Sequence, residues 1–331
     1  MTKNIYTFSP QIAQFEVDPK NYTDAKEKTF RGGCGVAFFV IDNNNKKKYV
    51  NKRTLRKLSS RPDDFDTKIF IQEVTTFALY RHPAIVPFIG YAIDEKRYGN
   101  IYLEYMENGS LDQYIEKKSK DPLFDDTHKL IISYGIARAM KFLHSHRILH
   151  RDLKSENILL DTQLRPYITD FGTSKASDSS KQTSQTVQQT TACIMPPEFV
   201  TDYLKFNRTF PIDVYSYAMV LYHLWTEQTP YPKDSSISFI IQKTLDCDRP
   251  KFPSNSSLSE NWQKLITQCW DKDPVNRPTF SEICDRLETN DFITPDINKE
   301  LFDTYKSIID LAPTSSPKTV PQVMLEEVAK E

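Results

Sequence analysis

The spacing of apolar residues changes along the chain from strand-like to helix-like. Short apolar runs bounded by polar residues fill the segments around 22–52 and 85–106, which predicts β-strands. Between these segments, apolar residues recur at a period near 3.6 and predict a helix that carries Glu73. The apolar positions of this helix are Phe70, Val74, Phe77 and Ala78. The N-terminal third therefore predicts a small β-rich unit with one helix.

Helical periodicity dominates the following part of the chain. The segments 127–146 and 280–287 each place apolar residues on one face, and the run 213–226 is apolar nearly all round. The last pattern predicts a helix buried on every side. The apolar faces consist of Ile132, Ile136, Met140 and Leu143 in the first helix and Phe280, Ile283, Cys284 and Leu287 in the last. We expect an α+β fold with a small β-rich lobe, a larger α-helical lobe and a cleft between them.

Composition narrows the class of protein without identifying it. With 331 residues, of which 39% are hydrophobic and 26% charged, the chain is expected to be globular. A net charge of −1 provides no field for a polyanion, so no nucleic-acid partner is expected. Five scattered cysteines favour a reducing compartment. Because no signal segment or long apolar run is present, we expect no membrane association and a cytoplasmic or nuclear location.

Three polar positions in the middle of the chain form the most informative pattern. Asp152 closes a His-Arg-Asp triplet, Asn157 follows five positions later, and Asp170 opens an Asp-Phe-Gly triplet. Strand-like runs at 157–160 and 167–169 predict a hairpin that brings Asn157 and Asp170 together. Amide and carboxylate oxygens suit Mg²⁺, whose coordination the phosphates of a nucleotide complete. The pattern indicates phosphoryl transfer, with Asp152 accepting the proton of the substrate hydroxyl.

A second pattern lies in the β-rich unit. The run 30–37 is rich in glycine and precedes an apolar strand, which suits either close approach to phosphates or an ordinary hairpin. Lys52 follows Gly35 by 17 positions, and Glu73 follows Lys52 by 21. An ion pair between Lys52 and Glu73 would hold the lysine against the α- and β-phosphates. The alternative is a solvated surface pair, which is usually worth ~0–1 kcal/mol.

Together these motifs resemble a eukaryotic protein kinase catalytic domain, across roughly residues 22–290. The resemblance implies the bilobal protein-kinase fold, with ATP and Mg²⁺ as cofactors. It divides the chain into an N-terminal extension at 1–21, a kinase N-lobe at 22–106, a kinase C-lobe at 107–290 and a partly disordered C-terminal tail at 291–331. The implied activity is transfer of the γ-phosphoryl group of ATP to Ser/Thr hydroxyls of protein substrates in intracellular signalling.

The resemblance implies roles for particular positions. The implied catalytic residues are Asp152, Lys154, Lys52 and Glu73, and the implied metal ligands are Asn157 and Asp170. The residues implied to hold the nucleotide are Gly32, Gly33, Gly35, Ala37, Val50, Lys52, Leu103, Glu104 and Met106. Leu103 is the expected gatekeeper, and the backbone of 104–106 is expected to face adenine. Lys154 stands where Ser/Thr kinases place a lysine near the γ-phosphate, with Thr191 as its expected contact.

Later motifs extend the resemblance towards one branch of the family. Pro197 and Glu198 resemble the end of an activation segment, and Arg277 matches the arginine that pairs with such a glutamate. Asp213 opens the buried helix and is expected to steady the catalytic loop. The segment 269–280 most resembles the tyrosine-kinase-like group, whose members mainly phosphorylate Ser and Thr.

The chain also departs from the family pattern. Phe30 stands where the first glycine of the phosphate loop is expected, and Pro196 replaces the usual alanine before Pro197. Ala37 and Val50 differ from the usual residues by opposite changes in volume, so we hypothesise a compensating pair over the adenine ring. The departures leave a pseudokinase scaffold as the alternative function, although every catalytic polar residue is present.

The segment between Gly172 and Met195 is rich in Ser, Thr and Gln. Arg151 lies beside the implied catalytic aspartate and can pair with a phosphate on this segment. We therefore expect regulation by an upstream activating kinase or by autophosphorylation within 173–191. The candidate acceptors include Ser180, Thr183, Ser184 and Thr186. A loop that is flexible without being phosphorylated is the alternative.

The remaining histidines and the C-terminal end are less informative. His82, His144 and His146 have no carboxylate near them in sequence, so we interpret them as structural or solvated, and His150 as a packing residue under the catalytic loop. Past residue 292, Ile297, Leu301 and Ile308 allow a short helix, 312–323 resembles a linker, and 324–330 is either a docking helix or part of a tail.

Overall fold

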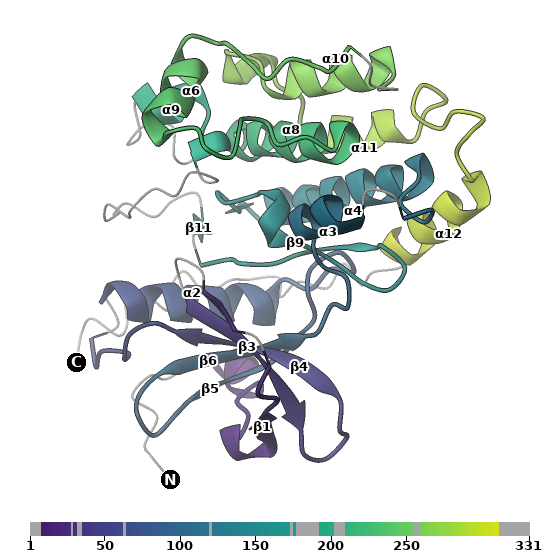
Figure 1. The fold of residues 1–331 in the computed structure, drawn as a ribbon. Helices are drawn as coiled ribbons and strands as arrows, with labels where there is room; N and C mark the ends of the chain where they lie inside the picture. The colour runs from purple at the N-terminus through teal and green to yellow at the C-terminus, as the bar shows by residue number, and fades with distance from the viewer. Residues whose placement is uncertain are drawn as a thin grey trace.

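A computed structural model gives the fold of the chain in two lobes. It describes residues 8–27, 29–31, 35–61, 64–118, 121–172, 175–176, 192–201, 209–254 and 258–310. Figure 1 shows a sheet with α2 in one lobe and a set of helices in the other. The predicted α+β fold is confirmed. None of the helices within these described ranges is long and apolar enough to cross a bilayer.

The N-terminal lobe is an antiparallel sheet of six strands. The strands are β1 (Tyr22–Asp24), β2 (Phe30–Arg31), β3 (Gly35–Asp42), β4 (Lys48–Thr54), β5 (Phe88–Ile93) and β6 (Gly99–Glu104). Their order is β1-β3-β4-β6-β5, and β2 pairs with β3. Ala37 lies opposite Lys52, and Phe39 lies opposite Val50. Since side chains alternate along a strand, Ala37, Val50 and Lys52 share one face of the sheet.

Helix α2 (Phe65–Leu79) packs against this sheet. The side chain of Asp64 caps its N-terminus by accepting a hydrogen bond from the backbone N–H of Thr67. The four predicted apolar positions are all buried, as is Glu73. The amphipathic pattern therefore identified the helix and its buried face correctly. The helix carries Glu73 on its buried side.

The C-terminal lobe consists mainly of helices. They are α3 (Leu111–Lys118), α4 (Asp126–Ser145), α6 (Pro197–Thr201), α8 (Pro211–Thr226), α9 (Ile237–Leu245), α10 (Glu260–Cys269), α11 (Phe280–Leu287) and α12 (Lys299–Asp310). Helix α8 is buried at every position from Ile212 to Leu224, which confirms the helix buried on all sides. Its Tyr217 donates a hydrogen bond from its hydroxyl to the carbonyl of Ser133 on α4, at 2.9 Å.

Short strands at the junction of the lobes carry the loops of the site. They are β7 (Gly109–Ser110), β8 (Ile148–Leu149), β9 (Ile158–Leu160), β10 (Pro166–Ile168) and β11 (Lys175–Ala176). β9 and β10 form the predicted antiparallel hairpin, and β8 pairs with β11. The catalytic loop runs from β8 through the short 3₁₀-helix Ser155–Asn157 into β9.

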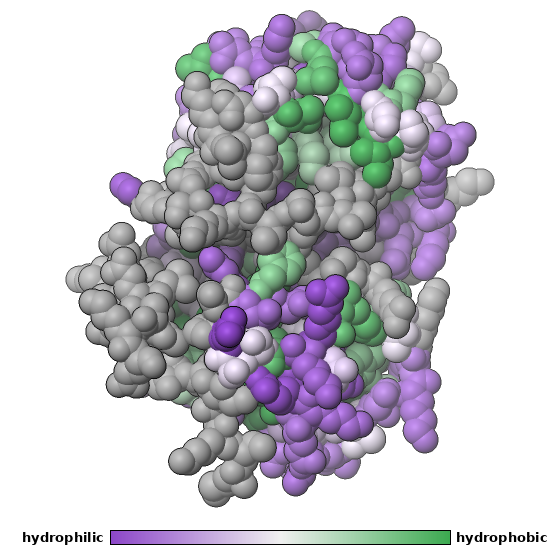
Figure 2. Space-filling view, turned by 90° about the vertical axis from the view of Figure 1, so that its left-hand side faces the viewer, coloured by the Kyte–Doolittle hydropathy of each residue, from purple (hydrophilic) through white to green (hydrophobic). Residues whose placement is uncertain are grey.

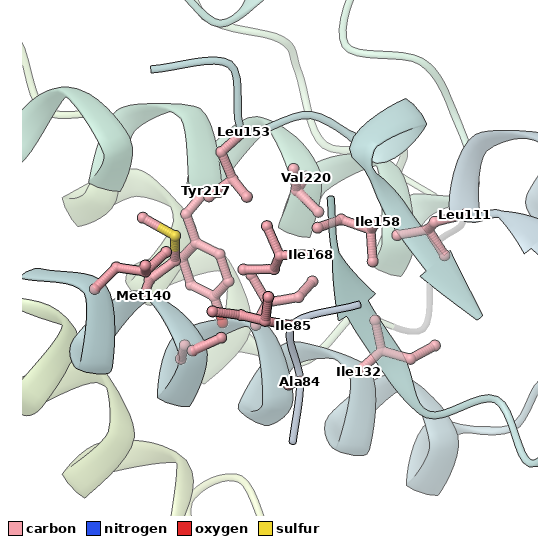
Figure 3. Close-up of a cluster of buried hydrophobic side chains, with 14 of the residues drawn as sticks. Ala84, Ile85, Leu111, Ile132, Met140, Leu153, Ile158, Ile168, Tyr217 and Val220 are labelled. Carbon is pink, nitrogen blue, oxygen red and sulfur yellow. The ribbon is translucent and has the colours of Figure 1, made fainter. Parts of the chain in front are cut away.

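A buried apolar cluster lies beneath the catalytic loop. Figure 3 shows Leu153 of this loop together with residues of α4, α8, β9 and β10. Leu153, Ile158 and Ile168 are fully buried. Interiors of this kind are packed closely enough to hold each side chain in place, so the polar residues that flank Leu153 have a rigid base.

Helix α12 packs against α4 at the C-terminal end of the described chain. The short helix that the sequence allowed is present, but its buried residues are Phe302, Tyr305 and Ile309, whereas Leu301 and Ile308 are exposed. Gly135 of α4 makes this packing feasible, because a Cβ there would lie 2.2 Å from the hydroxyl oxygen of Tyr305. Residues 311–331, including the expected linker and the segment 324–330, lie outside the described residues.

Candidate active site

Lys52 joins the two lobes through a pair of carboxylates. Its Nζ lies 2.6 Å from Oε1 of Glu73 on α2 and 2.8 Å from Oδ1 of Asp170. Only 15% of the lysine side chain and 4% of the Glu73 side chain are exposed, which excludes the solvated surface pair. The predicted ion pair is therefore present, and the same ammonium group also holds the aspartate of the Asp-Phe-Gly triplet.

The two carboxyl groups respond differently to this environment. Burial raises the pKa of Glu73, and the nearby Lys52 ammonium opposes the change. Burial acts in the same direction on Asp170, but the charge and hydrogen bond of Lys52, with His150, outweigh it and hold the pKa of Asp170 below its usual value. Asp170 is consequently a carboxylate at neutral pH, which is the form that binds a cation.

The catalytic loop brings Asp152, Lys154 and Asn157 together. Nζ of Lys154 lies 3.0 Å from Oδ2 of Asp152. The side-chain amide of Asn157 donates to the carbonyl oxygen of Asp152 at 2.7 Å and to its Oδ2 at 2.9 Å. The asparagine thus fixes the orientation of the aspartate, and the lysine places a positive charge beside it.

Asp213, at the start of α8, holds the backbone of this loop. Its Oδ2 accepts from the N–H of His150 at 2.9 Å and its Oδ1 from the N–H of Arg151 at 2.8 Å. Burial would raise the pKa of Asp213, but a 2.9 Å bond from His144 and the backbone N–H donors hold it low. The contact agrees with a structural role for His144, and its carboxylate partner was not visible in the local sequence because α4 and α8 bring these two residues together only in space.

The backbone is strained at two positions of the site. Arg151 has a φ of +68° and Asp170 a φ of +64°, in the left-handed region that non-glycine residues seldom adopt. Such conformations cost of order 1–3 kcal/mol each and persist only where the surroundings impose them. At Arg151 the hydrogen bond to Asp213 does so, and at Asp170 the Lys52 ion pair does.

A row of aromatic side chains connects the catalytic loop with the N-terminal lobe. The ring of His150 lies 5.2 Å from that of Phe171, which lies 4.9 Å from Phe77 of α2. Phe77 stacks in turn on Phe88 of β5 at 5.9 Å. The expected packing role of His150 is confirmed, since its side chain is fully buried against Phe171. Local periodicity identified Phe77 as apolar but gave no signal for this row.

The donor atoms present fit a magnesium ion that is completed by a nucleotide. The Asn157 amide nitrogen binds Asp152, so its oxygen is the group left to face a cation, and Asp170 supplies a carboxylate. Within the described ranges, no three His, Cys, Asp or Glu side chains gather in a way that could hold a metal by themselves. Mg²⁺ commonly binds through one or two protein groups and takes phosphate oxygens for the rest.

The described residues implied to hold the nucleotide lie on β3, β4 and β6 and directly after β6. Gly35 has to be glycine here, because a Cβ would lie 2.6 Å from the carbonyl oxygen of Arg53. Leu103 is buried and pairs with Val50, and Met106 is buried too. The side chain of Glu104 binds Lys47. Gly32, Gly33, Cys34 and Thr191 lie outside the described residues.

Phe30 and its neighbours form an aromatic group near the same face. Phe30 pairs with Ala37 across β2 and β3, is 39% exposed, and meets Phe39 edge to face at 5.7 Å. Phe39 meets Tyr105 in the same manner at 5.2 Å, and Nζ of Lys48 lies over both of these rings. Sequence reasoning noticed Phe30 only as a departure and did not find its aromatic partners.

A buried ion pair connects the first turn of α6 with the segment before α11. Arg277 donates to Glu198 through two nitrogens, at 2.6 Å and 2.8 Å, and both side chains are buried. The pairing expected between them is therefore present. The two parallel hydrogen bonds hold Glu198 and the segment before α11 together.

The two-lobed α+β fold and the lysine held between two carboxylates agree with the arrangement that the resemblance to protein kinases implied. The family model described as "Protein kinase domain" matches residues 24–287. The chain belongs to the protein kinase domain family.

Curated relatives agree with this assignment. The RGS domain-containing serine/threonine-protein kinase A of Dictyostelium discoideum is 33% identical over 237 residues, which cover 72% of this chain and 20% of that protein. Serine/threonine-protein kinase CTR1 of Arabidopsis thaliana is 32% identical over 66% of this chain and 26% of its own length. Dual specificity protein kinase pyk3 of D. discoideum is 34% identical, with a coverage of 66% and 16%.

These relatives confirm the resemblance to the tyrosine-kinase-like group of Ser/Thr kinases. The aligned region covers 20% of the length of the first of these relatives and 26% of the length of CTR1. The similarity therefore concerns the kinase domain.

Proposed function

We propose that this protein is an ATP-dependent protein serine/threonine kinase. The observation that carries the proposal is the position of Lys52 between Glu73 and Asp170, while Asn157 orients Asp152 from the opposite lobe. The proposal assigns residues 22–106 to the nucleotide lobe and 107–290 to the substrate lobe, with 1–21 and 291–331 as flanking segments. It also assigns the protein to the cytoplasm or nucleus.

In the proposed reaction, the hydroxyl oxygen of a substrate Ser or Thr forms a bond to the γ-phosphorus of ATP. The bond from that phosphorus to the β,γ-bridging oxygen breaks, ADP leaves with the bond's electron pair, and the hydroxyl proton passes to Asp152. Bound Mg²⁺ would supply charge neutralisation on the phosphates. Asn157 and Asp170 are the side chains that would hold it, since they carry the suitable oxygen atoms.

The residues of this chain mainly position charge. Glu73 and Asp170 hold the Lys52 ammonium at a fixed point, where it can bind the α- and β-phosphates. Lys154 lies beside Asp152 and can offset charge that develops on the transferred group. Fixed charges of this kind stabilise a transition state without reorganising during the reaction, and removal of one typically costs about 10²–10³-fold in rate.

The adenine side of the proposed site consists of Ala37, Val50, Leu103 and the backbone of 104–106. The shared face of Ala37 and Val50 supports the hypothesis that they act as a compensating pair. The aromatic group around Phe30 adds an apolar boundary to the same region. Gly32 and Gly33 are proposed to approach the phosphates with their backbone N–H groups.

Protein substrates and regulation form a further part of the proposal. Figure 2 shows apolar residues gathered over the helical lobe, whereas the visible part of the sheet lobe is mostly hydrophilic. Phe239 of α9 is 45% exposed, and exposed apolar surface favours a macromolecular substrate. We also propose control by phosphate on 173–191, of which the structure describes only Lys175 and Ala176. Phosphate mapping by mass spectrometry of active protein tests that control.

The experiment that tests the activity is phosphorylation of a peptide library with radiolabelled ATP and Mg²⁺, with Asp152→Ala as the matched control. We expect label on Ser and Thr peptides with the wild-type chain and a large loss with the variant. No incorporation by either protein, or equal incorporation by both, would contradict the proposed activity. A preference for Tyr peptides would contradict the role of Lys154 and agree with the dual-specificity relative.

A further inference from the structure

Residues 8–17 precede the family match and pack against the N-terminal lobe. This N-terminal strap, defined as residues 8–17, includes the short helix α1 (Pro10–Ala13), which contacts α2. Phe8 is 8% exposed and Ile12 is 1% exposed. In Figure 1 the purple N-terminal segment lies with the sheet lobe. Such burial is more than a solvated terminal extension would show.

The strap also pairs with the edge of the sheet. The N–H of Val17 donates to the carbonyl of Tyr91 at 2.9 Å, and the N–H of Tyr91 donates to the carbonyl of Phe15 at 3.0 Å. Glu16 and Tyr91 form a parallel bridge. Because β5 is the last strand of the sheet, the strap covers an edge whose backbone groups would otherwise lack strand partners.

Gly90 of β5 provides the space for this contact. A Cβ at position 90 would lie 2.5 Å from the carbonyl oxygen of Phe15 and 2.6 Å from Cγ1 of Val17. Both distances are shorter than real Cβ contacts, so any larger residue would displace the strap. The sheet thus carries a position whose lack of a side chain accommodates this particular segment.

Aromatic contacts connect the strap to the active site through β5. Phe15 lies 5.5 Å from Phe88, the last member of the aromatic row that starts at His150. The guanidinium group of Arg81 lies over the ring of Phe15, 4.6 Å from the centre of that ring. Phe15 therefore extends the row of His150, Phe171, Phe77 and Phe88 by one ring.

A second contact reaches α2 independently. Phe8 lies 4.7 Å from Tyr91, and Tyr91 lies 6.4 Å from Phe70 of α2. Both routes act on the helix that presents Glu73 to Lys52. Aromatic pairs of this kind contribute about 0.5–1.5 kcal/mol beyond their buried area.

We propose that the N-terminal strap is a positioning element for phosphoryl transfer, which holds α2 where Glu73 binds Lys52. This inference rests on the proposed function. An α2 that moves away from the lysine would form an inactive state, and the strap adds contacts that only the observed position of α2 provides. A ligand or segment shifts such an equilibrium by its difference in affinity for the two states. In this protein the N-terminal strap is the segment that shifts the equilibrium between the two positions of α2.

The test compares Phe15→Ala and Gly90→Ala in the full chain with Gln11→Ala, an exposed residue of the same strap. We expect kcat to fall about tenfold for the first two variants. KM for the peptide should change little, and Gln11→Ala should resemble the wild type. The double variant Phe15→Ala/Gly90→Ala should lose no more than either single variant, because both remove the same contact. Phe15→Tyr, which keeps the aromatic ring, should have a kcat close to that of the wild type.

Two further measurements, the hydrogen exchange of α2 and the folded fraction of each variant, keep the outcome decisive. Hydrogen exchange in Phe65–Leu79 should become faster in Phe15→Ala at unchanged folded fraction, and it reports on α2 even if the wild-type chain transfers no phosphate. Absence of phosphoryl transfer by the wild-type chain would contradict the proposed function, and the exchange rates would then decide whether the strap holds α2. Unchanged kcat with unchanged exchange would overturn the inference. A loss of kcat that only follows loss of folded protein would overturn it as well.

Discussion

Arg277 binds Glu198 through two parallel hydrogen bonds, at 2.6 Å and 2.8 Å, although 79 residues separate them in the sequence. The arginine also donates to the backbone carbonyls of Asp271 and Pro211. The guanidinium group is thus surrounded by acceptors and joins α6, α8 and the turn before α11. A planar five-donor group suits this position, which lysine could not fill in the same way.

Removal of the arginine should therefore cost much of the stability of the helical lobe. We expect Arg277→Met to lower the free energy of unfolding by roughly 3–5 kcal/mol, because it leaves a buried carboxylate without a partner. Glu198→Leu combined with Arg277→Met should cost less than the sum of the single changes. Urea denaturation measures all three, and strictly additive losses would contradict a direct coupling of these two charges.

Lys52 gives a second prediction, which separates activity from folding. Lys52→Met should lower the rate of phosphoryl transfer by roughly 10²-fold or more, since the phosphates lose their fixed ammonium group. Its cost in stability should be moderate, because the raised pKa of Glu73 allows this carboxyl to become protonated once the lysine is gone. Lys52→Met/Glu73→Gln should be more stable than Lys52→Met alone and equally inactive. Denaturation and kinetic assays on one preparation give both answers, and retained activity in Lys52→Met would contradict the assignment.

Sequence alone indicated candidate site residues wherever a motif lies on or beside a helix or strand that the apolar pattern predicts. Glu73 was placed because its helix has a regular apolar face, and Asp170 because a hairpin pattern precedes it. Lys52 and Asp170 are 118 residues apart, and their contact was not predicted, since the sequence pointed to Glu73 as the partner of Lys52. The local sequence pattern carries no information about which residues come into contact across such a long separation in the chain.

The features that sequence did not predict depend on three-dimensional packing. His144 and Asp213 are 69 residues apart, so the sequence around one of them gives no indication of the other. On α12 the buried face contains Phe302, whereas the sequence pointed to Leu301. The docking of residues 8–17 requires the absence of a side chain at Gly90, which no periodicity reveals.

The hypothesis that Ala37 and Val50 compensate each other in volume predicts a change in nucleotide affinity. Ala37→Val should raise KM for ATP by up to about tenfold, because it adds volume to a face that already carries valine. Val50→Ala in the same chain should reverse most of that effect. Steady-state kinetics with varied ATP provide the measurement. An unchanged KM in Ala37→Val would show that these two residues do not line the adenine site.

His82 predicts a loss of stability in mild acid. Its Nδ1 accepts a hydrogen bond from the N–H of Ala84 at 3.1 Å, so the imidazole is neutral there. Burial, with a smaller effect of the Arg138 charge, lowers its pKa from 6.5 to about 4. The unfolded chain therefore takes up a proton between these values that the folded chain does not. Stability is complete above pH 6.5 and declines towards pH 4.

The contribution of this histidine should be about 2 kcal/mol between pH 7 and pH 5. His82→Gln, which cannot take up the proton, should reduce the pH dependence of the unfolding free energy by about that amount. Urea denaturation at a series of pH values measures the slope. Equal slopes for the variant and the wild type would mean that other groups account for the acid sensitivity.

The most direct test of the central assignment is the effect of Mg²⁺ on ATP binding, measured by calorimetry in two variants that cannot complete the reaction. In Asp152→Ala, where Asn157 and Asp170 are intact, Mg²⁺ should tighten ATP binding at least about tenfold. In Asp152→Ala/Asp170→Ala that gain should be lost. The same Mg²⁺ effect in both variants, or no ATP binding in either, would contradict a single site formed by Lys52, Asn157 and Asp170.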